Sequence, residues 1–258
     1  MRDRVPDMEY FFCDTGAELP ETYEYLNKLE VVLGKPIARL NSARGFDHWF
    51  EVFRGALPSP QMRWCTKYMK IKPLEAWLGD TQAISYVAIR ADESNRKGYI
   101  STKPSITTSF PFVEDGIDHA GVLKILDEAG VGLPSYYDWR TRSGCYFCFY
   151  QRKAEWVGLA DRHPELFERA VAIESKVLLN AGAGQDANYE DNAMQGRAYT
   201  WSSGESLPEL LDRRSEILER HEGRMQRERE RRENVPLVEV LAGALDDDDA
   251  EGCAICSL

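Results

Sequence analysis

The residues with the clearest chemical potential in this sequence are cysteines. Cys145 and Cys148 are separated by two residues, a spacing that lets both sulfurs bind one metal ion, and Gly144 gives the backbone the freedom to make that turn. Arg140 and Arg142 precede the pair, so a thiolate or an anionic ligand there would be electrostatically stabilised. The alternative is a pair of buried structural cysteines among aromatic residues.

Cys65 is the natural third ligand, because it also lies among basic residues. Three thiolates suit an iron–sulfur cluster with one iron left open, or a zinc site completed by a fourth ligand. Cys13 is a candidate for the fourth position, although packing is the commoner role of a lone cysteine. We therefore predict a metal site at Cys65, Cys145 and Cys148.

A second cysteine pair, Cys253 and Cys256, follows the acidic run 246–249 near the end of the chain. Such a run is typical of a disordered spacer, so we expect a mobile dithiol. A mobile dithiol can act as a redox shuttle, supply additional metal ligands or have no role, and the sequence does not rank these alternatives.

The elements that must position these residues are typical of an α/β protein. Residues 8–13 form an apolar, aromatic run that predicts a buried strand. A helical pattern follows from Pro20, with Gly34 as its C-terminal stop, and residues 36–40 predict another strand. A strand–helix–strand unit is the building block of a parallel sheet that is covered by helices.

Residues 83–89 predict a further strand, which ends in the polar loop 90–94. Open parallel sheets bind their ligands at such strand ends. Helical patterns cover residues 64–69, 73–79, 122–129, 164–177 and 208–233. We predict a doubly wound, mostly parallel sheet flanked by helices, with a helical C-terminal region.

Composition narrows the class of protein. Of the 258 residues, 43% are apolar and 29% charged, as in soluble globular proteins. No apolar run approaches the roughly 18 residues of a membrane helix, and no signal peptide opens the chain, so we expect a cytoplasmic protein. The net charge of −11 disfavours wide, nonspecific polyanion binding but allows a local basic pocket for one nucleotide.

Three parts of the sequence together resemble the phosphoadenosine phosphosulfate reductase family of the adenine nucleotide alpha-hydrolase-like superfamily. The parts are residues 12–23, residues 63–74 with 89–96, and residues 144–148 with 163–167. The resemblance spans roughly residues 8–180 in the family's order. We therefore expect an adenine nucleotide alpha-hydrolase-like domain over residues 1–180, a helical extension over 181–245 and an acidic, cysteine-containing flexible tail over 246–258.

The resemblance implies roles for particular residues. Residues bordering the nucleotide pocket would be Asp14, Thr15 and Gly16, and residues contacting the anionic groups of the nucleotide would be Arg90, Glu93 and Ser94. A guanidinium binds phosphate or sulfate oxygens in a bidentate manner, which agrees with the role of the arginine. In the family members that have a four-iron, four-sulfur cluster, cysteines hold it, and the resemblance implies that Cys65, Cys145 and Cys148 would be the ligands here. Family reductases attack sulfur with a C-terminal cysteine, which makes Cys253 and Cys256 candidate catalytic residues.

Two departures from the family pattern affect the expected activity. The Ser-Gly-Gly-Lys-Asp-Ser type of phosphate loop does not occur in this sequence. Such a loop cradles phosphates with backbone N–H groups, so it would come from upstream, come from a partner, or be lost. Cluster-bearing reductases usually present adjacent cysteines, whereas Cys65 is followed by Thr66. The open iron position resembles that of sulfur-inserting thiolases and of the sulfur-incorporating component of DNA phosphorothioation.

We therefore expect a sulfur-metabolism enzyme that binds an adenine nucleotide, either ATP or a sulfonucleotide, and an iron–sulfur cluster. Sulfur transfer to a nucleic acid is favoured over reduction of a sulfonucleotide to sulfite. One alternative is a noncatalytic subunit of a multi-protein sulfur-transfer or defence complex that retains the fold without the phosphate loop. Another is a zinc-stabilised binding module.

Overall fold

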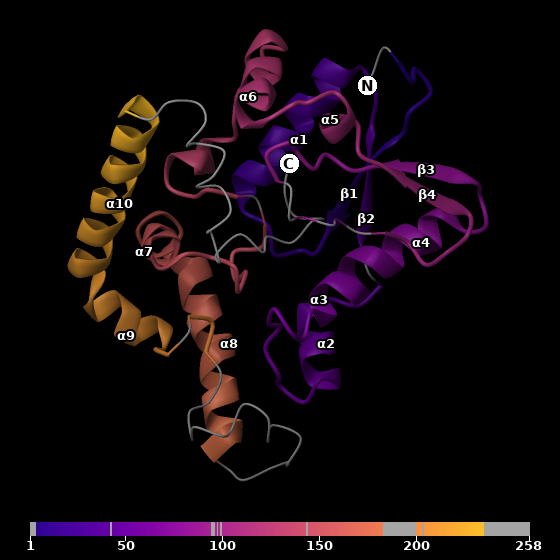
Figure 1. Cartoon of the computed structure of the whole chain (residues 1–258). Helices are drawn as coiled ribbons and strands as arrows, with labels where there is room; N and C mark the ends of the chain where they lie inside the picture. The colour runs from indigo at the N-terminus through magenta and orange to yellow at the C-terminus, as the bar shows by residue number, and fades with distance from the viewer. Residues whose placement is uncertain are drawn as a thin grey trace. The chain divides into compact units, whose positions relative to one another are not determined.

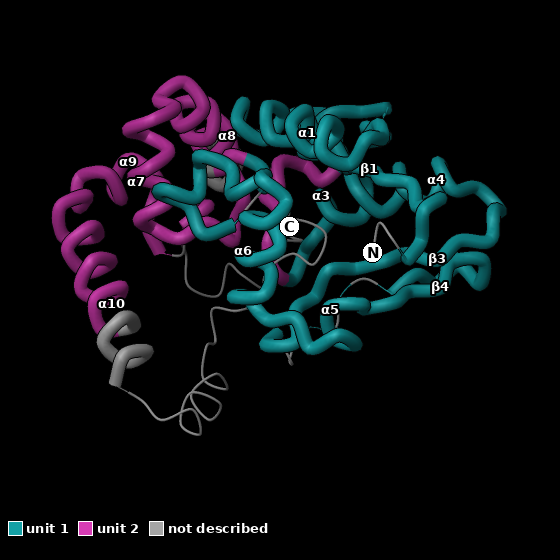
Figure 2. The backbone as a smooth tube through the Cα atoms, turned by 90° about the horizontal axis from the view of Figure 1, so that it is seen from above, with its two compact units in different colours: residues 1–52, 61–145, 252–258 teal, residues 53–60, 146–251 magenta. Residues whose placement is uncertain are grey.

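The computed structural model places two compact units in the chain. It describes residues 4–41, 43–93, 96, 98, 100–142, 144–182, 200–202 and 204–234. Unit 1 comprises Met1–Val52, Gln61–Cys145 and Gly252–Leu258, and unit 2 comprises Phe53–Pro60 and Tyr146–Glu251 (Figure 2). The boundary between the units therefore passes through the segment that carries Cys145 and Cys148.

The predicted strand–helix–strand unit opens unit 1 (Figure 1). Strand β1 (Tyr10–Asp14) pairs in parallel with β2 (Ile37–Asn41), and helix α1 (Pro20–Leu33) connects them. Pro20 opens the helix, where its missing N–H costs nothing. Gly34 ends it with a left-handed φ of 66° and donates its N–H to the carbonyl of Glu30.

A nearly continuous helical stretch follows in three parts. Helix α3 (Trp64–Thr66) leads into the π-helical turn η1 (Lys67–Ile71), which continues as α4 (Lys72–Leu78). The sequence predicts that Pro73 begins or kinks a second helix, because proline lacks an N–H and its ring clashes with the carbonyl four residues earlier. In the structure Pro73 lies in the first turn of α4, and a widened turn just before it lets the chain remain helical.

A second pair of strands lies later in unit 1. Strand β3 (Ala83–Tyr86) pairs in parallel with β4 (Ile106–Ser109), and the predicted strand at residues 83–89 is thus shorter than expected. The α/β class with parallel strands is confirmed, and the strands within the described ranges form two pairs, β1–β2 and β3–β4. Further helices of unit 1 are α2 (Phe46–Val52), α5 (Pro111–Glu114), α6 (His119–Glu128) and the 3-10 helix η2 (Ser135–Asp138).

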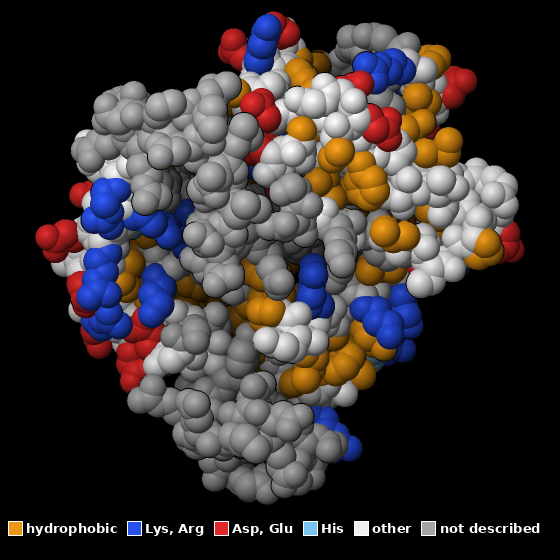
Figure 3. Space-filling view, viewed as in Figure 1, with side chains coloured by type: hydrophobic (Ala, Val, Ile, Leu, Met, Phe, Trp, Pro, Cys, Tyr) orange, Lys and Arg blue, Asp and Glu red, His pale blue; other side chains and the backbone are white. Residues whose placement is uncertain are grey.

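Unit 2 supplies the predicted helical C-terminal region. It contains α7 (Lys153–Arg162), α8 (Pro164–Gly182), α9 (Leu207–Asp212) and α10 (Arg214–Asn234). The charged helix expected over residues 208–233 is thus divided in two at Arg213. On the face shown in Figure 3, basic and acidic side chains intermingle along α10, as in a solvated helix. In the described ranges, no helix has the length and apolar character needed to cross a bilayer.

One buried carboxylate fastens the chain that precedes α9 to helix α8. Glu174 is 1% exposed and accepts hydrogen bonds from the backbone N–H groups of Trp201 (2.9 Å) and Leu207 (2.7 Å). The indole N–H of Trp201 donates to the carbonyl of Ala170 at 3.0 Å. Burial raises the pKa of Glu174 above its ordinary value, while the two backbone hydrogen bonds oppose that rise.

We predict that Glu174→Gln lowers the free energy of unfolding by about 1–3 kcal/mol, because an amide has one acceptor oxygen for two buried N–H groups. Urea unfolding measures this change. Glu168→Gln, at an exposed position of the same helix, is the matched control and should stay within about 0.5 kcal/mol of the native chain. Equal effects of the two substitutions would contradict the role of Glu174.

The same carboxyl group gives this prediction a pH dependence. Because its pKa is raised, the folded protein holds the Glu174 proton more tightly than the unfolded chain does. The native chain should therefore lose stability as the pH rises through the range just above 4.5, the ordinary value, and Glu174→Gln should lack this component.

Candidate functional site

The turn after β1 brings a hydroxyl, a carboxylate and a distant thiol together. The hydroxyl of Thr15 donates to Oε1 of Glu18 at 2.7 Å, and both residues are buried. The Sγ atom of Cys145 lies 3.1 Å from Oγ1 of Thr15 and 4.0 Å from Oε1 of Glu18. A hydroxyl that donates to a carboxylate can still accept a hydrogen bond from a thiol, so Thr15 links Cys145 to Glu18.

Asp14 and Gly16 shape this turn. Oδ1 of Asp14 accepts the N–H of Gly16 at 2.9 Å and the hydroxyl of Tyr23 at 2.8 Å. Gly16 has a φ of 71°, a conformation that favours glycine. Burial, the hydrogen bond to Asp14 and the charge of Glu18 raise the pKa of Tyr23, so its hydroxyl keeps its proton and remains a donor. Asp14 therefore stabilises the turn through the hydroxyl of Tyr23 and the backbone N–H of Gly16.

Two charged residues beneath the turn are buried. Burial raises the pKa of Glu18, and this rise is opposed by the hydrogen bond from Thr15 and by the charge of Lys70. Lys70 is 6% exposed and belongs to η1. The thiol of Cys13 lies 3.6 Å from the carbonyl oxygen of Lys70, so Cys13 packs β1 against η1.

A buried guanidinium holds the chain immediately before Cys145. Arg140 is 1% exposed and donates to the carbonyls of Gly144 (3.1 Å) and Cys145 (2.8 Å). Gly144 has a φ of 146°, which favours glycine. Within the described ranges, Arg140 forms no salt bridge with a carboxylate. Because a buried charge is costly without a counterion, a thiolate or a bound anion beside Cys145 would stabilise this arrangement.

The loop after β3 holds its arginine in an internal network. Nε and a terminal nitrogen of Arg90 donate to the two carboxylate oxygens of Asp92 at 2.9 and 3.2 Å. Glu93 accepts the backbone N–H of Arg90 at 3.1 Å and pairs with Arg96 at 2.6 Å. The hydrogen bond and charge of Arg90 lower the pKa of Asp92, although burial opposes this. Ser94 lies outside the described residues.

The predicted cysteine ligands are distributed over both units. Cys65 and Cys145 are half-buried in unit 1, and Cys148 is half-buried in unit 2. Among the residues that the structure describes, no three or more Cys, His, Asp or Glu side chains are arranged to hold a metal ion. The three-cysteine ligand set therefore stays a prediction. Cys253 and Cys256 lie outside the described residues.

Glu18, Tyr23 and Lys70 also lie at this turn, although they are not among the site residues predicted from the sequence. Thr15 and Glu18 follow the Thr-x-x-Glu spacing of a capping box, a signal that the sequence does contain. Tyr23 and Lys70 carry no such signal, because their roles depend on contacts made only in the folded chain.

Residues 1–108 match the phosphoadenosine phosphosulfate reductase domain. The N-terminal part of the chain is therefore similar to this domain. The family belongs to the adenine nucleotide alpha-hydrolase-like superfamily, so the expected resemblance is confirmed. The match includes the turn of Thr15 as well as Cys65 and Arg90, and Cys145 and Cys148 lie beyond it.

Two uncharacterized proteins of Methanocaldococcus jannaschii are similar to this chain. The first is 25% identical over 232 residues, which cover 84% of this chain and 51% of the relative. The second is 26% identical over 175 residues, which cover 63% of this chain and 35% of the relative. The chain thus spans about half or less of the length of these curated relatives.

We predict that Arg140→Met lowers the free energy of unfolding by about 2–4 kcal/mol, because two carbonyl groups lose a buried charged donor. Urea unfolding measures the loss. Arg4→Met removes an exposed arginine that pairs with Asp115, and this control should cost about 1 kcal/mol or less. A gain in stability at Arg140 would mean that burying the charge costs more than its hydrogen bonds contribute.

Proposed function

We propose that this chain is a sulfur-metabolism enzyme that binds an adenine nucleotide beside the carboxyl end of β1. The observation that carries the proposal is the approach of the Cys145 thiol to Thr15, within the turn of a phosphoadenosine phosphosulfate reductase domain. Strand ends in parallel sheets are where such folds bind ligands. The nucleotide would lie against Asp14, Thr15 and Gly16.

The anionic part of the nucleotide would bind the loop of Arg90, Glu93 and Ser94. Arg90 holds Asp92 in a bidentate pair, which is the geometry that a guanidinium also offers to phosphate or sulfate. Binding would require Arg90 to exchange at least part of this pair for the ligand. Glu93 then keeps the loop in shape, because it holds the backbone of Arg90 and the side chain of Arg96.

An iron–sulfur cluster at Cys65, Cys145 and Cys148, four-iron and four-sulfur in type, is a further part of the proposal. The two-residue spacing of one cysteine pair and the buried charge of Arg140 support it. Among the described residues no group of three or more potential ligands is arranged to hold a metal ion, so the proposal depends on these two features. A cluster would supply redox chemistry or an iron that binds sulfide.

For the reaction, we favour sulfur transfer to a nucleic acid acceptor over sulfonucleotide reduction. In a reduction, a tail thiolate at Cys253 or Cys256 would attack the sulfur and displace the nucleotide. The second thiol would then release sulfite and close a disulfide, so two electrons pass from the dithiol to the sulfonyl group. Sulfite release from adenosine 5′-phosphosulfate distinguishes reduction from transfer.

A second candidate is a noncatalytic subunit of a multi-protein complex, and the exposure of the strands favours it. Parallel strands are normally buried in larger sheets, but here they occur as two pairs. Phe11 on β1 is 38% exposed and Ile84 on β3 is 58% exposed. A protein partner that covers these apolar side chains would stabilise the fold in the absence of nucleotide.

We predict that Arg90→Gln weakens the binding of ATP and of adenosine 5′-phosphosulfate by about tenfold or more, because a bidentate charged contact is lost. Isothermal titration calorimetry measures the affinity. Arg39→Gln is the matched control on β2, where the guanidinium contacts Asn27, and should leave binding unchanged. If the native chain binds neither nucleotide, the enzyme proposal fails and the subunit proposal gains support.

We predict that anaerobically purified protein contains iron and sulfide, and that Cys65→Ser, Cys145→Ser and Cys148→Ser each remove most of both. Thiolate ligands hold such clusters, and a hydroxyl is a poor replacement. Chemical analysis of metal and sulfide provides the measurement. Cys13→Ser is the control, since this thiol contacts a carbonyl oxygen. Zinc without sulfide would instead favour the zinc-stabilised binding module.

A further inference from the structure

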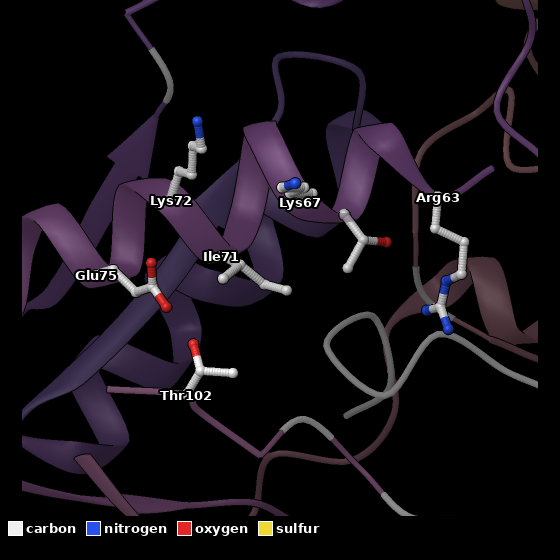
Figure 4. Close-up of a pocket in the computed structure, with 7 residues that line it drawn as sticks. Arg63, Lys67, Ile71, Lys72, Glu75 and Thr102 are labelled. Atoms are coloured by element: carbon white, nitrogen blue, oxygen red, sulfur yellow. The ribbon is translucent and has the colours of Figure 1, made fainter. Parts of the chain in front are cut away.

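The helical stretch α3–η1–α4 carries a pocket that the proposed nucleotide site does not use. The pocket has a volume of about 460 Å³, within the usual range for small-molecule sites. Its lining residues are Arg63, Thr66, Lys67, Ile71, Lys72, Glu75 and Thr102, all in unit 1 (Figure 4). In Figure 4, Thr102 reaches toward the helix across from Ile71 and Glu75, and Arg63 lies at the other end.

Positive charge predominates around this pocket. Three of the lining residues are basic, Arg63, Lys67 and Lys72, and one is acidic, Glu75. Lys67 and Lys72 are exposed, and across the described part of the chain neither forms a salt bridge with a carboxylate. In a chain with a net charge of −11, a local group of three cations is the surface that would attract an anion.

The π-helical turn explains why the two lysines share this pocket. In an α-helix, residues five apart lie about 140° apart around the axis. In η1 the N–H of Lys72 bonds to the carbonyl of Lys67, five residues back, so the two residues lie nearly one above the other. The widened turn thus places both on one side, while Met69 and Lys70 face the interior.

An aromatic pair positions the two ammonium groups at the rim of the pocket. Nζ of Lys72 lies 4.4 Å and Nζ of Lys67 lies 5.5 Å from the ring centroid of Tyr68. Tyr68 in turn stacks on Trp49 of α2 at a centroid distance of 4.3 Å. Cation–π contacts of this kind hold a lysine without neutralising its charge, so both ammonium groups can still bind an anion.

We propose that this pocket binds a phosphate ester that also carries hydroxyl groups. Lys67 and Lys72, which both lie over Tyr68, would bind the phosphate oxygens, since ammonium groups form short, charge-assisted hydrogen bonds with phosphate. Glu75 and Thr102, which lie at the Lys72 end of the pocket in Figure 4, would accept hydrogen bonds from the hydroxyls. Free nucleotides and nucleic-acid strands share this chemistry. The proposal stands independently of the nucleotide site at β1.

The test compares two probes, ribose 5-phosphate and a single-stranded RNA of about twelve nucleotides, by calorimetric titration. The double variant Lys67→Gln, Lys72→Gln should weaken binding by about tenfold or more, whereas Lys67→Arg, Lys72→Arg should restore it. Lys124→Gln removes an exposed lysine from α6 as the control. Thermal unfolding checks that each variant remains folded.

The outcomes separate the pocket from the proposed nucleotide site. The proposal is supported if the double Gln variant loses affinity while Arg90→Gln and Lys124→Gln retain it. Tighter binding of RNA than of ribose 5-phosphate would identify a nucleic-acid strand as the source of the phosphate. Tighter binding of ribose 5-phosphate would identify a free nucleotide. Equal affinity of native and double Gln proteins for both probes, or no binding by the native chain, would overturn the proposal.

Discussion

The arrangement of unit 1 depends on one contact between distant parts of the chain, the packing of Cys145 against the turn after β1. Cys145 is 130 residues from Thr15, yet its sulfur lies 3.1 Å from the threonine hydroxyl. The backbone of Cys145 is fixed from the other side by Arg140, whose guanidinium donates to two successive carbonyls. The thiol therefore reaches the strand end from a backbone that is hydrogen-bonded to Arg140.

This contact places several charges where water has little access. Glu18, Lys70 and Arg140 are each less than one-tenth exposed. Charges of this kind are stable in a protein interior only when they are matched by opposite charges or hydrogen bonds. Glu18 and Lys70 influence one another directly, whereas Arg140 is compensated by carbonyl dipoles. Because carbonyl oxygens do not neutralise the positive charge of Arg140, a thiolate at Cys145 or an anionic ligand beside it would be stabilised.

The helical stretch α3–η1–α4 gives the same segment two different faces. Its inner face packs Met69 and Lys70 against β1, where the thiol of Cys13 meets the Lys70 carbonyl. Its outer face presents Lys67 and Lys72 to solvent. A regular α-helix would place these two lysines on different sides. The π-helical turn, which the following Pro73 favours, brings Lys67 and Lys72 to the outer face and leaves Lys70 on the inner face.

Local features of the chain determined most of its secondary structure. The apolar run before Asp14, the proline that opens α1 and the glycine that ends it are short-range signals, and the structure confirms the elements they predict. Strand β4 and helix α7 escaped prediction, because Ile106–Ser109 is short and polar and Lys153–Arg162 has a weak helical pattern. The reductase-like character of the domain also followed from motifs that the sequence displays.

Only the tertiary structure decided which of the chemically capable residues meet. The folded chain brings the thiol of Cys145 to Thr15 and Glu18, a proximity that the spacing of Cys145 and Cys148 in the sequence does not predict. It also engages Arg90 with Asp92. These outcomes depend on long-range packing and on the balance between burial and hydrogen bonding, which no local pattern encodes. The sequence by itself therefore determined most of the elements and the similarity of residues 1–108 to the reductase domain, and the packing of distant segments decided which side chains meet.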